Sequence, residues 1–461
     1  MPKWRKVSDF PYSAEHLYSW HARNGAFVRL TPPWEKIKIV SWKGGEATEN
    51  LPELQQIGDI SKGALIKLQM KVGPFPLRFH AEHVDAKSPS FFTDVQRKGP
   101  FAEWKHVHRF VPVGKHSSQM DDDIFFRMPF GLGNWFTTNK LEKTFAFRHR
   151  RLQNDLARHS QFADQPRLTV AITGASGLIG RQLSAFLRTG GHRVLSMVRR
   201  KTNNPEDIFW SPQQIETEKL EGVDAVIHLA GETIASRWTK SKKEKIKNSR
   251  VLGTQCIAKA LASLKNPPKV FISASAVGFY GTSQTASFDE KSPVGDDFLA
   301  EVCQQWEAAA EPARVAGIRV VHPRIGLVVT TAGGAVGKML FPFSMGLGGP
   351  VGSGKQWMSW IALDDLLGVF YHCLFDSSVV GPINAVSPNS VTNKQFTTAL
   401  GQALRRPAVL PLPSFVVKLM FGEMGKTLLL EGAKVLPNAL QQSNFKWFFP
   451  SLKESLSFEC G

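Results

Sequence analysis

The segment from Thr169 to Gly180 limits the possible folds of this chain more than any other part of the sequence. It reads TVAITGASGLIG, an apolar run followed by Gly174, Gly177 and Gly180, and a helical pattern continues to Leu187. A strand, a glycine turn and a helix in this order bring backbone N–H groups against a pyrophosphate. The segment therefore predicts a dinucleotide site in preference to an ordinary glycine-rich loop.

Each glycine of the turn has a separate expected role. Gly174 allows the tight turn, Gly177 the close approach of the phosphates, and Gly180 the packing of helix on strand. The residues expected to contact the cofactor here are Gly174, Ser176, Gly177, Leu178, Ile179 and Gly180.

Strand and helix patterns alternate after this point, which is typical of a parallel, doubly wound sheet. The expected strands are 168–173, 193–198, 225–229, 270–275 and 319–321. We predict a Rossmann domain over residues 167–330. The glycine-rich loops that follow introduce a small C-terminal substrate subdomain over 331–461.

The first 158 residues have a different organisation. Short β-type runs (37–42, 64–72, 79–84, 91–96, 104–111 and 123–128) precede a long helical pattern from Leu141 to Leu156. Ser13 is placed to cap an earlier helix. We therefore predict an α+β domain over 1–158, separated by a polar linker, 159–167, from the α/β domain.

Charge and composition disfavour nucleic-acid-binding, secreted and membrane-spanning classes of protein. The 461 residues carry a net charge of +18, but the basic residues are dispersed, and the densest run, 240–247, contains a glutamate and suits a solvent-facing helix. No nucleic-acid reading motif is present. No signal peptide is visible, no apolar run reaches the roughly 20 residues of a membrane span, and the four cysteines are scattered. We expect a cytoplasmic protein without specific nucleic-acid binding, and the oligomeric state stays open.

Five motifs that occur in order resemble the extended short-chain dehydrogenase/reductases. They are Asp224–Glu232, Ser273–Gly281, Trp306–Ala310, Gly349–Trp360 and Leu430–Pro437. Together they resemble the atypical "epimerase family protein" branch, also labelled NAD(P)-dependent epimerase-like or cell-division-inhibitor-like, over residues 168–458. The resemblance places Leu229, Ala230 and Gly231 against the ribose and pyrophosphate, and Pro323 on the nicotinamide side.

The N-terminal domain resembles the polyketide-cyclase/START-like helix-grip superfamily. The motifs are Ser13–Leu17, Leu30–Trp34, Gly73–Leu77 and Gly99–His106. This resemblance implies a curved sheet around a long helix and an apolar cavity that binds a ligand; without it, the aromatic residues here are simply core.

The second expected strand of the Rossmann domain ends in Arg199 and Arg200, with no acidic residue nearby. An acid at this point binds the ribose 2′-hydroxyl of NAD, whereas arginine accommodates the 2′-phosphate of NADP. We therefore expect NADP, less so NAD, with both arginines as ligands. The alternative is a solvated basic turn.

The family's catalytic constellation is incomplete. Ser275 aligns with the serine that holds the substrate oxygen, and Ser273 is the reserve. The Tyr-x-x-x-Lys pair that exchanges the proton is missing, since its lysine position falls near Cys303. Tyr280 is the remaining phenol, so we predict Ser275 and Tyr280 as catalytic residues.

Four further residues are candidates for binding substrate: Glu232, Arg237, Arg250 and Trp357. Arg250 occupies the family's asparagine position and suits an anionic substrate, with a surface salt bridge as the alternative. Glu232 either binds substrate or caps a helix. His106 and His108 alternate on one strand face, but no matching carboxylate or cysteine stands nearby in sequence, so we expect no metal site.

Two functions remain. The preferred one is an NADP-dependent oxidoreductase or epimerase that acts on a small anionic substrate. The alternative is an NADP(H)-binding regulator or sensor without proton-transfer catalysis, whose N-terminal domain binds an apolar ligand. Nucleic-acid or membrane binding through the basic charge is the least favoured class.

Overall fold

The computed structural model describes residues 3–72, 75–129 and 133–461. The chain forms two compact units. The first comprises residues 1–163, 185–191 and 461, and the second comprises residues 164–184 and 192–460. Gly73 and Pro74, which belong to one of the N-terminal motifs, lie outside the described residues. The boundary expected at residue 330 stays a prediction.

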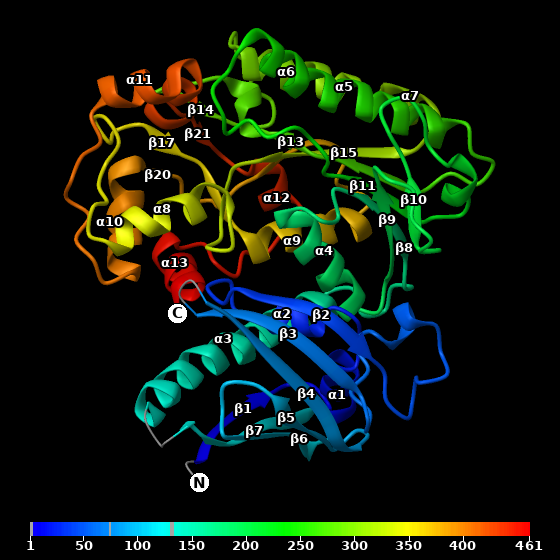
Figure 1. Cartoon of the computed structure of the whole chain (residues 1–461). Coiled ribbons are helices and arrows are strands. Elements are labelled where there is room, and N and C mark those ends of the chain that lie inside the picture. Colours follow the sequence, from blue (N-terminus) through cyan, green and yellow to red (C-terminus); the bar gives the residue numbers. More distant parts are fainter. Residues whose placement is uncertain (1–2, 73–74, 130–132) are drawn as a thin grey trace. The chain divides into compact units, whose positions relative to one another are not determined.

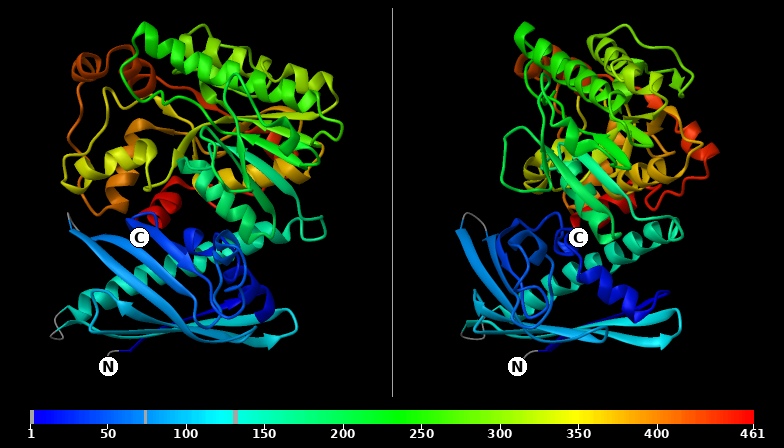
Figure 2. Two further views of the ribbon diagram at one scale, coloured as in Figure 1. Left: turned by 45° about the vertical axis from the view of Figure 1, so that its right-hand side comes forward. Right: turned by 90° about the vertical axis from the view of Figure 1, so that its right-hand side faces the viewer.

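The first unit is built on an antiparallel sheet in which the described residues form seven strands, in the order β1-β7-β6-β5-β4-β3-β2 (Figures 1 and 2). The strands are β1 (Lys3–Phe10), β2 (Ile37–Lys43), β3 (Leu65–Val72), β4 (Phe75–Lys87), β5 (Phe91–Lys98), β6 (Glu103–Gly114) and β7 (Ser117–Arg127). The helices are α1 (Ala14–His21), α2 (Ala26–Leu30), a 3-10 turn (Glu53–Gln56) and α3 (Asn134–Ser160).

Local sequence explains the helices of this unit. The Ser13 hydroxyl accepts a hydrogen bond from the His16 N–H at 3.2 Å, which caps α1 as predicted. In α3, Leu152 and Leu156 are fully buried and pack with Phe92 and Phe110 of the sheet. The long helix is therefore held by an apolar stripe, and it extends beyond the 141–156 expected from sequence.

Two features of this unit were not expected. Strand β1 buries Trp4 and Phe10, with Lys6 and Ser8 half-buried between them on the same face, and no strand was expected there from the sequence. Strand β7 begins at Ser117, six residues before the strand expected over 123–128, and it includes the acidic triplet Asp121–Asp123. The expected apolar cavity receives no support, because buried histidines and aspartates line this face of the sheet beside α3.

The second unit contains a parallel sheet in the order β10-β9-β8-β11-β12-β15-β13, with β19 also paired to β15. Its strands are β8 (Thr169–Thr173), β9 (Arg193–Val198), β10 (Asp207–Phe209), β11 (Ala225–His228), β12 (Val270–Ser273), β13 (Ser275–Ala276), β15 (Arg319–Ile325) and β19 (Gly381–Ala385). The predicted doubly wound parallel sheet is confirmed. The strand order reverses at β8, so a ligand crevice is expected outside the carboxyl ends of β8 and β11.

Helices cover both faces of this sheet. In Figure 1, α5, α6 and α7 lie along one face, and α4 and α9 along the other. The helices are α4 (Leu178–Thr189), α5 (Lys240–Ala262), α6 (Phe298–Ala308), α7 (Glu311–Val315), α8 (Gly334–Ser344), α9 (Leu363–Phe375), α10 (Asn393–Ala403), α11 (Ser414–Gly425), a π-helical turn (Lys426–Leu430), α12 (Asn438–Gln442) and α13 (Leu452–Cys460). Small strands are β14 (Ser287–Phe288), β16 (Leu327–Val329), β17 (Trp357–Met358), β18 (Trp360–Ala362), β20 (Val391–Thr392) and β21 (Lys434–Val435).

Strand β15 continues through Pro323 to Ile325, whereas the sequence predicted its end at residue 321. A proline inside a sheet removes one ladder hydrogen bond. Here Val321 pairs with Ile272 of β12 and Arg324 with Ser275 of β13, so Pro323 lies opposite the interruption between the two strands. The missing N–H therefore falls where the ladder is already broken.

The described part of the chain contains no helix that is long and apolar enough to cross a bilayer.

Candidate functional site

The glycine turn after β8 has the geometry that its spacing predicted. Gly174 has φ of +70°, a conformation that other residues rarely adopt. A Cβ on Gly180 would lie 2.1 Å from the Gly174 carbonyl oxygen, so only glycine lets α4 start this close to the strand. The Gly177 N–H donates to the same oxygen at 2.9 Å.

The exposed side of this turn fits an anion. Ser176 and Gly177 are exposed, and Leu178 and Ile179 begin α4, whose first N–H groups have no partner within the helix. A helix N-terminus reached through a glycine turn stabilises a phosphate through these N–H groups and the helix dipole. The residues present therefore fit a dinucleotide pyrophosphate.

Thr173 joins the ends of two neighbouring strands. Its hydroxyl oxygen accepts hydrogen bonds from the N–H groups of Leu229 at 3.0 Å and Ala230 at 3.2 Å. It also lies 2.7 Å from Nδ1 of His228, whose pKa burial lowers to about 3. Thr173 was not among the site residues expected from the sequence, although a polar residue at the end of an apolar strand indicates such a contact.

Arg199 and Arg200 lie exposed at the end of β9. The Arg199 guanidinium lies over the Trp210 ring, 4.5 Å from its centroid, while Trp210 itself is buried. Cation–π contact of this kind orients the arginine at the edge of the crevice. Both arginines thus stand where a 2′-phosphate would be met, and that role remains a prediction.

Ser275 belongs to a buried polar network that the sequence analysis did not predict. Its hydroxyl donates to Glu307 Oε1 of α6 at 2.7 Å. Arg324 of β15 donates to both carboxylate oxygens of Glu307, each at 2.8 Å. This bidentate pair is almost fully buried, with 4% of the Arg324 side chain and 13% of the Glu307 side chain exposed.

Tyr280 is the other end of this network. Its hydroxyl donates to Asn384 Oδ1 at 2.7 Å and accepts from Arg324 at 2.9 Å. Burial raises the pKa of the phenol despite the nearby Arg324 guanidinium, which also lies over the Phe279 ring. The geometry therefore makes Tyr280 a partner of Arg324, and its assignment as a proton donor stays a prediction without further support.

Cys303 lies where the resemblance requires a lysine. It precedes Glu307 by one turn of α6, is buried, and interacts with Ser275. Burial raises the pKa of its thiol to about 12, so the group is neutral. No cation at this point lowers the pKa of a phenol, which removes the electrostatic basis of the family's proton exchange.

Arg250 lies against the loop that follows β11. Its Nη1 donates to the carbonyls of Glu232 at 3.0 Å and Ile246 at 3.1 Å. A Cβ on Gly231 would lie 3.2 Å from the guanidinium carbon, so a glycine here leaves room for the arginine. Burial lowers the pKa of Arg250, and its contacts differ from those of the surface salt bridge considered as the alternative.

The other substrate candidates are more dispersed. The Glu232 carboxylate pairs with Lys242 of α5 at 2.5 Å. Arg237 lies beside Gly422 of α11, while the Trp357 indole donates to the Gln284 carbonyl at 3.0 Å. The structure thus brings together Glu232 and Arg250, and it places Arg237 and Trp357 on other segments. Pro323 is buried in β15, one residue before Arg324.

Two aspartates at the start of α9, Asp364 and Asp365, do not cap the helix. The N-cap of α9 is Ala362, and both aspartates lie in the first turn. The Asp365 carboxylate instead accepts hydrogen bonds from the N–H groups of Phe448 and Phe449, at 2.7 and 2.9 Å. It therefore fastens the C-terminal segment, which the local sequence of α9 could not indicate.

Known proteins resemble both the second unit and the whole chain. Residues 170–382 match the NAD dependent epimerase/dehydratase family, and residues 412–458 match a domain of unknown function, DUF1731. An epimerase family protein of Mycobacterium leprae is 40% identical over 295 residues, 63% of this chain and 95% of that protein.

Two solved structures are similar. One, described as a nucleoside-diphosphate sugar epimerase from Corynebacterium glutamicum, has a TM-score of 0.80 and 33% identity over 99% of this chain and 90% of its own. The other is human epimerase family protein SDR39U1 with NADPH, with a TM-score of 0.58 and 37% identity over 64% of this chain and 99% of its own. The first similarity includes the N-terminal unit; the second covers about the length of the epimerase-like part.

Proposed function

The chain belongs to the NAD dependent epimerase/dehydratase family, and on this premise we propose that it binds NADP(H) and acts as an oxidoreductase or epimerase on a small anionic substrate. The observation that carries the proposal is the turn at Gly174–Gly180, where positive φ and a 2.1 Å approach require glycine. The human relative that was solved with NADPH supports the choice of cofactor.

The residues at the crevice divide the binding task. The N-terminus of α4 would hold the pyrophosphate, and Arg199 and Arg200 would hold the 2′-phosphate. When bound, NADP(H) supplies hydride transfer at the nicotinamide ring. Arg250, beside Gly231, would supply positive charge for an anionic substrate.

Ser275 would orient the substrate. Its single hydroxyl proton is donated to Glu307, which leaves the oxygen's lone pairs to accept a hydrogen bond from a substrate hydroxyl. Glu307 in turn is fixed by Arg324, so the serine has one orientation. A serine held in this way favours recognition of an alcohol over polarisation of a carbonyl.

The experiment is a binding and turnover series on the full chain. We expect NADPH to bind more tightly than NADH, and Arg199→Glu/Arg200→Glu to remove this preference. Ser275→Ala should abolish oxidation by NADP of a panel of small phosphorylated or carboxylated alcohols, while NADPH binding stays unchanged. Tighter binding of NADH, or full turnover in Ser275→Ala, contradicts the proposal.

A second function, an NADP(H) sensor without turnover, is favoured by one specific observation. The Ser275, Glu307, Arg324 and Tyr280 side chains already satisfy one another, and Cys303 replaces the cation needed for proton exchange. The same assay separates the two functions. Tight NADPH binding with no change in nicotinamide absorbance across the substrate panel supports the sensor.

The N-terminal unit would serve as a ligand-binding module of the helix-grip type in either case. Its antiparallel sheet and long α3 support this part of the proposal. The apolar ligand and the cytoplasmic location stay predictions.

A further inference from the structure

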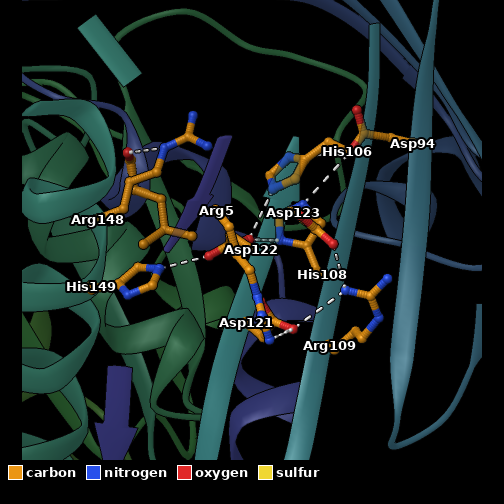
Figure 3. A network of polar contacts seen from close by, with 11 residues as sticks. Arg5, Asp94, His106, His108, Arg109, Asp121, Asp122, Asp123, Arg148 and His149 are labelled. Carbon is orange, nitrogen blue, oxygen red and sulfur yellow. Dashed lines mark hydrogen bonds and ion pairs between the residues drawn. The ribbon is translucent and has the colours of Figure 1, made fainter. Parts of the chain in front are cut away.

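A buried cluster in the first unit has no part in the proposed dinucleotide chemistry. It consists of Asp94 on β5 with His106 and His108 on β6, and one potential ligand atom from each lies within 4.8 Å of the others. All three side chains are buried, and the two histidine rings lie 3.6 Å apart between centroids. Figure 3 shows them together with Asp122 and His149.

Strand pairing explains why residues so far apart in sequence meet. Asp94 pairs with His106, and His108 pairs with Asp122 of β7, so these side chains share one face of the sheet. The alternation of β7 sends the neighbours of Asp122 the other way. Asp121 and Asp123 both form ion pairs with Arg109, at 3.3 and 3.2 Å.

The distances within the cluster fit a shared metal ion better than direct hydrogen bonds. Asp94 Oδ2 lies 3.6 Å from His106 Nδ1 and 3.5 Å from His108 Nε2, beyond good hydrogen-bond length. Metal bonds of roughly 2.0–2.2 Å in tetrahedral geometry place neighbouring ligand atoms about 3.3–3.6 Å apart. These two separations match that edge.

Asp122 holds the opposite nitrogens of the same two rings. Its Oδ1 lies 2.9 Å from His106 Nε2 and 2.7 Å from His108 Nδ1, while its Oδ2 lies 2.6 Å from His149 Nε2 of α3. Metal-binding histidines commonly engage a carboxylate through their second nitrogen, which fixes the tautomer and aims the first nitrogen at the metal. Asp122 makes this hydrogen bond to His106, whereas its contact with His108 Nδ1 is an ion-pair contact without hydrogen-bond geometry.

His83 of β4 supplies an independent observation. It pairs with Asp94 across β4 and β5, and its side chain is therefore on the same face. The residue is buried, with 4% of its surface exposed, and its Nδ1 has no hydrogen-bond partner among the described residues. A buried nitrogen without a partner is unfavourable, and a metal ion or its bound water would satisfy it.

We propose that Asp94, His106 and His108 bind one divalent transition-metal ion such as Zn²⁺, with Asp122 as the positioning residue. Two histidines and one carboxylate leave at least one coordination position for water or a ligand. The proposal differs from the expectation from sequence that no metal binds here, and it is independent of the dinucleotide function.

The test uses the full chain, stripped with a chelator and titrated with Co²⁺ and Zn²⁺. We expect one ion per chain and a visible Co²⁺ absorption band of an N/O site. Asp94→Asn and His108→Asn should each weaken binding by more than about 100-fold, and Asp122→Asn by about 10–100-fold with a shifted band. His116→Asn, which removes an exposed histidine of the β6–β7 turn, is the matched control and should bind like the wild type.

Two further measurements show whether a variant loses metal binding because it misfolds. NADPH affinity should be unchanged in every variant, and metal should raise the Tm of the wild type but not of Asp94→Asn. Wild-type protein that binds no metal, or Asp94→Asn and His108→Asn that bind as tightly as the wild type, would overturn the proposal. In that case the cluster is a structural hydrogen-bond network.

Discussion

Replacing Glu307 with alanine tests the buried network around Ser275 most directly. The substitution removes both carboxylate acceptors of the Arg324 guanidinium, which keeps only the Tyr280 hydroxyl, and it removes the acceptor of the Ser275 hydroxyl. Because 4% of the Arg324 side chain is exposed, water cannot replace the lost carboxylate. An unpaired buried cation of this kind costs about 3–5 kcal/mol of folding free energy.

The measurement is urea and thermal unfolding of the second unit, followed by tryptophan fluorescence. At 2–4 °C per kcal/mol for domains of moderate size, Tm should fall by about 6–20 °C. The control is Glu311→Ala, which breaks an exposed Arg–Glu pair with Arg314 and should change stability by less than about 1 kcal/mol.

A double substitution separates the charge from the packing. Glu307→Leu/Arg324→Met removes both partners and should recover much of the loss, because a buried ion pair and an apolar pair of similar volume are often nearly equal in stability. If the free energy of unfolding of Glu307→Ala is within about 1 kcal/mol of the wild-type value, Glu307 does not hold Arg324 as described, and Ser275 has no fixed orientation.

Two further outcomes follow from the site. Gly180→Ala should weaken NADPH binding at least about 10-fold, because the new Cβ would lie 2.1 Å from the Gly174 oxygen. The control, Gly337→Ala, has a nearest contact of 3.4 Å and should bind NADPH like the wild type, so equal affinities of the two variants contradict this prediction. The thiol of Cys303, with a pKa of about 12, has about one thiolate in ten thousand molecules at pH 8, so iodoacetamide should label it only after unfolding, as peptide mass spectrometry would show. Labelling of native protein within minutes would refute its burial.

Local patterns predicted the parts of the fold that local interactions determine. The glycine turn, the Ser13 cap and the parallel strands follow from spacing, capping chemistry and alternation, and the resemblance to the epimerase family is confirmed. Strand β1 was not predicted because Lys6 and Ser8 lie between Trp4 and Phe10 on the inward face and interrupt the apolar alternation. Alternation in a charged strand is a weak signal unless the partner strand is known.

The polar clusters could not be predicted because their members meet only through strand pairing. Asp94 lies 12 residues before His106, its partner across the strands, and Asp122 lies 16 residues after His106, so no spacing motif joins them. Likewise Arg324 meets Glu307 only when β15 is placed beside α6. A charged residue inside an apolar strand was the available hint.

The hydroxyl of Thr173 has a consequence for how the crevice holds a ligand. Because this oxygen accepts hydrogen bonds from the N–H groups of Leu229 and Ala230, both donors already have partners within the protein. The N–H groups of Leu229 and Ala230 can therefore not donate to a molecule bound at the end of β11. Directional recognition of phosphate falls to α4 and the arginines, so selectivity for a charged ligand is concentrated on one wall of the crevice.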